Sequence, residues 1–93
     1  MNISFRIPTI LRTYTSGESS VDVQVDVATL QGALDALEKV APGISQRLLD
    51  ESGALRRFIN VYINDDDVRF LSGLDTELSE GASISIVPAV AGG

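Results

Sequence analysis

The last two residues of the chain, Gly92 and Gly93, are the residues best placed to do chemistry. They closely follow a segment, 83–87, that alternates apolar and polar side chains as a strand does. Glycine loses more backbone freedom on ordering than any other residue and packs nothing. A diglycine end is therefore a thin tail whose carboxylate could enter another protein's active site and react there. An ordinary frayed terminus is the alternative interpretation.

Side chains suited to catalysis are scarce in the rest of the sequence. The chain has no histidine and no cysteine, so the commonest general base, the commonest metal ligand and the thiol nucleophile are missing. The only dense acidic run, Asp65 to Asp67, lacks the glycine and the terminal glutamate of a calcium-binding loop. No glycine-rich phosphate loop precedes a helix. The sequence predicts a protein that is not an enzyme and binds no metal or cofactor of its own.

Composition indicates one small domain that folds by packing alone. The 93 residues are 44% hydrophobic and contain no cysteine. A net charge of −6 disfavours nucleic acid and favours a partner with a basic docking face. No segment approaches the ~20 apolar residues of a membrane span, and the first residues lack the pattern of a signal peptide. We expect a cytoplasmic protein without a membrane or nucleic-acid partner.

The pattern of apolar residues predicts five strands and one main helix. Strands are expected at 3–7, 21–26, 58–64, 68–70 and 83–87. Thr29 is the expected N-cap of a helix that ends at Pro42, and Ser45 is expected to cap one further helical turn. Gly32 should weaken the main helix by roughly 1 kcal/mol relative to alanine.

This order of elements predicts an α+β protein with a β-grasp fold, in which a mixed sheet of four to five strands packs on one main helix. Residues 1–88 form the domain, and residues 89–93, which include Val90 and Ala91, form a flexible C-terminal tail. The expected core consists of alternating strand residues and one helix stripe: Ile3, Phe5, Ile7, Val21, Val23, Leu30, Leu34, Leu37, Ile59, Val61, Ile63, Ile84 and Ile86.

Three apolar side chains are predicted to form a docking patch for a partner protein. Phe58 and Tyr62 alternate with the core residues of their strand, and Val87 joins them on the last strand. Exposed apolar clusters on a sheet usually mark a partner site. Two alternatives are that a ring covers the sheet in the monomer, or that the strand phase is displaced by one residue. The side chains of Arg12, Arg56 and Arg57 are interpreted as solvated. Alternatively, they pair with an acidic rim on a partner protein.

Three segments resemble the ThiS/MoaD family of ubiquitin-like sulfur carriers, and most closely its CysO type. They are Ile7 to Arg12, Phe58 to Phe70, and Val87 to Gly93. Family members often have Gly-Asp before the last strand, where this chain has Gly81-Ala82. That position is a turn, so the difference concerns local turn chemistry more than function.

The resemblance implies that the chain is a protein co-substrate for other enzymes. An E1-like adenylyltransferase would use ATP to join the carboxylate of Gly93 to AMP, and sulfide or a persulfide would displace AMP to leave a thiocarboxylate. For the CysO type, a PLP-dependent cysteine synthase would accept the sulfur and a JAMM metalloprotease would regenerate the carrier. The sulfur could equally enter another sulfur-containing metabolite instead of cysteine. The alternatives are a ubiquitin-like modifier joined to lysines through Gly93, and a β-grasp binding module that does not need Gly93.

Overall fold

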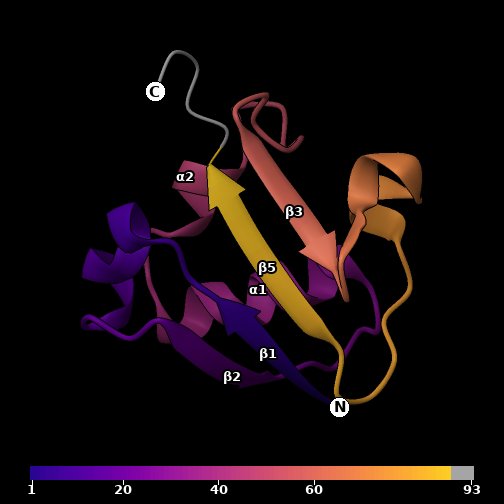
Figure 1. The fold of residues 1–93 in the computed structure, drawn as a ribbon, viewed down its shortest axis with the longest axis horizontal. Helices are drawn as coiled ribbons and strands as arrows, with labels where there is room; N and C mark the ends of the chain where they lie inside the picture. Colours follow the sequence, from indigo (N-terminus) through magenta and orange to yellow (C-terminus); the bar gives the residue numbers. More distant parts are fainter. Residues whose placement is uncertain (89–93) are drawn as a thin grey trace.

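A mixed five-stranded sheet forms one layer of the protein in its computed structural model, which describes residues 1–88. The predicted tail, residues 89–93, lies outside the described residues. The strands lie in the order β2-β1-β5-β3-β4 (Figure 1). Only β1 and β5 run parallel among the pairs of this sheet. The strand bounds are β1 Asn2–Arg6, β2 Ser20–Gln24, β3 Ile59–Ile63, β4 Asp66–Asp67 and β5 Ser83–Pro88.

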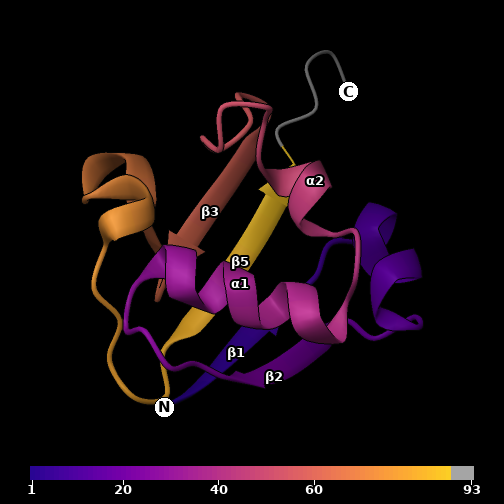
Figure 2. The ribbon, with the colours of Figure 1, turned by 180° about the vertical axis from the view of Figure 1, so that it is seen from behind.

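The main helix, α1 Leu30–Val40, crosses one face of the sheet (Figure 2). Its predicted N-cap is confirmed, because the Thr29 hydroxyl accepts the backbone N–H of Gly32 at 3.1 Å. The helix buries its apolar stripe against the sheet and turns its polar residues outward. A second, short helix, α2 Ser45–Leu48, follows on the same side of the sheet. The β-grasp arrangement that the sequence predicts is therefore the observed one.

The glycine in the first turn of α1 fills a place where no other residue fits. A Cβ atom built on Gly32 would lie 2.1 Å from the carbonyl oxygen of Val27 and 2.9 Å from its carbonyl carbon. Real Cβ atoms do not approach backbone so closely, and the contact cannot be relieved by a side-chain rotation. The expected comparison with alanine at this position therefore does not apply, because close packing outweighs helix propensity.

Two local predictions are wrong. The predicted strand at 68–70 is a 3-10 helix, η2 Val68–Phe70, because Asn64 and Asp65 both adopt positive φ and reverse the chain early, so that β4 pairs at 66–67. After β1 the chain forms another 3-10 helix, η1 Thr9–Thr15. Ser45 does not cap α2, whose N-cap is Ile44, with no side-chain cap bond. A further 3-10 helix, η3 Gly73–Asp75, follows η2.

The core lies between the sheet and α1. Every predicted core residue except one is buried, and Ile3, Phe5, Leu30, Leu37 and Ile84 are fully inaccessible. The exception is Val21, which is only half-buried because β2 is an edge strand of the sheet. Within residues 1–88, no helix is long and apolar enough to cross a membrane.

Candidate functional site

The face of the sheet opposite α1 is the candidate site, because it presents the predicted docking residues and ends where residues 89–93 begin. Figure 1 shows this face, with α1 and α2 behind the strands. The burial of Ile59, Val61 and Ile63 confirms the predicted phase of β3. The intervening residues of β3 therefore point to the open face.

Phe58 and Val87 lie at one end of this face, whereas Tyr62 lies toward the other end of β3. Tyr62 pairs with Ser85 and is half-buried, whereas Val87 pairs with Asn60 and is 42% exposed. Phe58 was expected within the strand but lies in the turn just before β3, with 58% of its surface exposed. Because Ile59 pairs with Pro88, the exposed Phe58 and Val87 lie at the end of the sheet from which residues 89–93 continue.

Arg69 in η2 fixes the segment that presents Phe58, and sequence reasoning missed this role. Its guanidinium group donates to the carbonyl oxygen of Ile59 at 2.7 Å and to the side-chain oxygen of Asn60. The same group reaches the carbonyls of Arg56 and Arg57 at 3.3 and 3.4 Å. All four acceptors lie 9–13 residues earlier in the chain, so no local sequence signal marks the contact.

Two further apolar side chains are exposed in the segment that follows β4, the edge strand next to β3. Phe70, which follows Arg69 in η2, is 86% exposed, and Leu71 is 46% exposed. Apolar exposure therefore extends beyond the three predicted docking residues.

The two carboxyl groups with shifted pKa values, Glu38 in the last turn of α1 and Asp50 in a loop, do not form a reaction centre. Two backbone N–H groups, of Gly43 at 2.7 Å and Ser45 at 3.0 Å, hold the pKa of Glu38 below its usual value. A hydroxyl bond from Ser52 and the backbone N–H of Ala54 lower the pKa of Asp50. Both carboxylates organise turns. Over residues 1–88, no three acidic side chains gather in a way that could hold a metal ion.

The fold and this open face define a β-grasp domain of the ubiquitin-like class. The chain of known structure in the Amycolatopsis orientalis BexX/CysO complex superposes with a TM-score of 0.88 at 49% identity, covering 98% of this chain and 99% of that one. The sulfur carrier protein CysO of Mycobacterium tuberculosis is 50% identical over 95 residues, which span all of both chains. Small archaeal modifier protein 3 of Haloferax volcanii is 37% identical over 83% of this chain and 84% of its own.

The ThiS family model matches residues 5–93, and this chain belongs to that family. The resemblance to the ThiS/MoaD family and to its CysO type is thereby confirmed. The predicted function, that of a ubiquitin-like sulfur carrier protein, is confirmed by the same comparisons. The roles of Gly93, of the tail residues Val90, Ala91 and Gly92, and of the docking patch stay predictions.

Proposed function

We propose that this carrier bears sulfur on the main-chain carbonyl of Gly93, as a thiocarboxylate that a biosynthetic enzyme consumes. The observation behind the proposal is the full-length match to a protein named as a sulfur carrier. A sulfur atom bound to the C-terminal carbonyl needs no cysteine, and this chain has none.

Activation of the carboxylate must precede sulfur transfer, because a free carboxylate would have to expel oxide. In the proposed first step, the carboxylate attacks the α-phosphorus of ATP on an E1-like adenylyltransferase, and pyrophosphate leaves. Sulfide or a persulfide then attacks the acyl carbon and AMP leaves, so that one C–O bond is exchanged for one C–S bond; a persulfide source also needs a reductive release. The sheet ends at Pro88, and the five residues beyond it can span at most roughly 17 Å. That length suits entry into a partner's active site while the domain stays outside.

Phe58, Tyr62 and Val87 are proposed to dock the adenylyltransferase. Phe58 and Val87 are supported by their exposure and by their place at the end of the sheet nearest residues 89–93, and Tyr62 is supported by its position on the same open face of β3. We expect Tyr62→Asp to weaken the complex while the domain stays folded, because a charge buried without a partner costs several kcal/mol. Val27→Asp is the matched control, since Val27 is 60% exposed and lies between β2 and α1. Normal binding by Tyr62→Asp would remove Tyr62 from the patch, and its unfolding would show that the ring supports the core.

ATP–pyrophosphate exchange tests the first step. The full chain should stimulate exchange by the adenylyltransferase of the same organism, and a chain that lacks Gly92 and Gly93 should not. The truncated chain places its carboxylate about 7 Å short of the reacting position, far outside the tolerance of a near-attack geometry. Exchange of equal rate with the truncated chain would contradict the proposal.

The acceptor of the sulfur is proposed to be a PLP-dependent cysteine synthase, with a JAMM metalloprotease releasing the product. The similarity to CysO supports this choice, because the resemblance to the CysO type implies this acceptor. A protein modifier is the second candidate, favoured by the 37% identity to small archaeal modifier protein 3. The two functions differ in the fate of the tail, which is a free thiocarboxylate for the carrier and an isopeptide bond to lysine for the modifier.

A further inference from the structure

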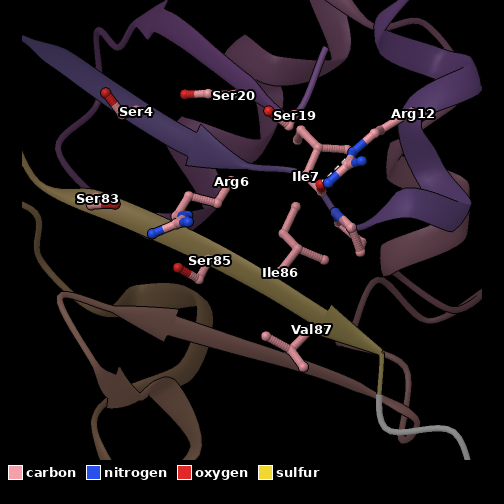
Figure 3. A pocket seen from close by; sticks show the side chains of 11 residues that line it. Ser4, Arg6, Ile7, Arg12, Ser19, Ser20, Ser83, Ser85, Ile86 and Val87 are labelled. Carbon is pink, nitrogen blue, oxygen red and sulfur yellow. Dashed lines mark hydrogen bonds between the residues drawn. The ribbon is translucent and has the colours of Figure 1, made fainter. Parts of the chain in front are cut away.

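A hollow of about 730 Å³ lies on the open face of the sheet, between β1, β5 and the start of η1 (Figure 3). Small side chains create it, because Ser4, Ser83 and Ser85 stand where larger residues would fill the surface of the sheet. Arg6 and Arg12 border it, and Val87 lies at its end nearest Pro88. The hollow therefore reaches the place where the tail leaves the domain.

Several polar groups of this hollow have no partner in the domain, although the Ser4 hydroxyl donates to the carboxylate of Asp22 at 2.7 Å. Within residues 1–88, the Arg6 side chain takes part in no hydrogen bond or ion pair, and the hydroxyls of Ser83 and Ser85 have no partner. In the Arg12 guanidinium group only Nε makes a hydrogen bond within residues 1–88, and it donates to the carbonyl oxygen of Ile7 at 3.1 Å. That bond directs its guanidinium group along the rim of the hollow, as Figure 3 shows.

The charge of this hollow is opposite to that of the protein as a whole. The chain carries a net charge of −6, yet two of its seven basic residues border the hollow and none of its lining residues is acidic. Guanidinium groups bind carboxylates through paired, charge-assisted hydrogen bonds, and hydroxyl donors can complete such a site. The chemistry that this hollow recognises is therefore that of a carboxylate.

We propose that the hollow receives an acidic segment of the adenylyltransferase, whose Asp or Glu carboxylates pair with Arg6 and Arg12. This inference rests on the proposed function. A partner that takes up residues 89–93 must lie against the end of the sheet, so the neighbouring hollow falls within its reach. One acidic element within an otherwise basic docking face fixes the orientation in which the carrier binds.

Binding without ATP is the test, so that it does not depend on adenylation. The dissociation constant of the carrier and the adenylyltransferase is measured for Arg6→Gln, Arg12→Gln and the control Lys39→Gln, an exposed residue of α1. Arg6→Gln is the decisive variant, because the Arg6 side chain makes no hydrogen bond or ion pair within residues 1–88. We expect it to raise the dissociation constant about 5- to 20-fold and to flatten its salt dependence, with no change for Lys39→Gln beyond that of bulk charge.

The inference would be overturned if Arg6→Gln and Lys39→Gln had equal dissociation constants for the adenylyltransferase, or if the unmodified carrier did not bind it. Arg6-dependent binding without any ATP–pyrophosphate exchange would instead support the inference and refute the proposed function. Inorganic phosphate provides a second arm at matched ionic strength. If it shifts the amide resonances of Arg6 and Ser85 but does not compete with the enzyme, the hollow is a site for small oxyanions, and the acidic segment is excluded.

Discussion

Replacing Arg69 by glutamine is expected to loosen the segment that presents Phe58. The Nη2 group has two hydrogens but faces three carbonyls, so the contacts at 3.3 and 3.4 Å share one hydrogen while the 2.7 Å bond to Ile59 uses the other. Hydrogen bonds of charged groups contribute about 1.5–3 kcal/mol each, and exposure of Arg69 reduces this. We expect a total loss of about 1–2 kcal/mol, which corresponds to a fall of roughly 5–15 °C in Tm.

Thermal unfolding followed by circular dichroism measures this loss. Arg57→Gln is the matched control, because Arg57 is exposed and its side chain makes no hydrogen bond to residues 1–88. Arg69→Lys keeps the charge but not the forked geometry, so it should recover less than half of the loss. If Arg69→Gln and Arg57→Gln melt together, the guanidinium contacts contribute nothing and the reasoning is refuted.

Three further outcomes are expected. Gly32→Ala should destabilise the domain by about 1–2 kcal/mol in urea unfolding, since the overlap with the Val27 carbonyl outweighs the gain in helix propensity; a more stable variant would contradict this. Glu38→Gln should flatten the acid side of the Tm–pH curve. Because the pKa of Glu38 is lowered in the folded state, this group contributes stability above its unfolded pKa, and the contribution is lost as the pH falls through its folded pKa. If Glu38→Gln left the acid side of the Tm–pH curve unchanged, this role of Glu38 would be refuted. Gly92→Val should keep the Tm and slow ATP–pyrophosphate exchange without abolishing it, because the reach is kept while a β-branched side chain must enter a channel shaped for none; full activity would show that the channel is wide.

Local patterns were enough to predict most of the fold. The alternation of Ile59, Val61 and Ile63 reports which face of β3 is buried, because side chains of a strand alternate strictly between faces. Thr29 marks the start of α1 because its side chain caps the helix through a bond to a residue three positions later. Both signals lie within a few residues of the feature that they predict.

The features that sequence analysis missed depend on groups distant in the chain or on backbone geometry. Arg69 binds carbonyls 10–13 residues away, which no side-chain pattern records. Position 32 requires glycine because of the carbonyl group of Val27, whose position is fixed only when the turn before α1 forms. The hollow brings Arg6 beside Ser85 through the parallel pairing of the first and last strands. Such a pairing joins opposite ends of the sequence, so the basic cluster appears only in the folded domain.

Intact-mass measurement of the carrier tests the central claim most directly. The chain is incubated with the adenylyltransferase of the same organism, ATP and sulfide, and fragmentation then locates any change. We predict that the mass rises by the difference between one sulfur and one oxygen atom, with the change confined to Gly93. An unchanged mass under conditions that support ATP–pyrophosphate exchange, or a sulfur atom located elsewhere in the chain, would contradict the account.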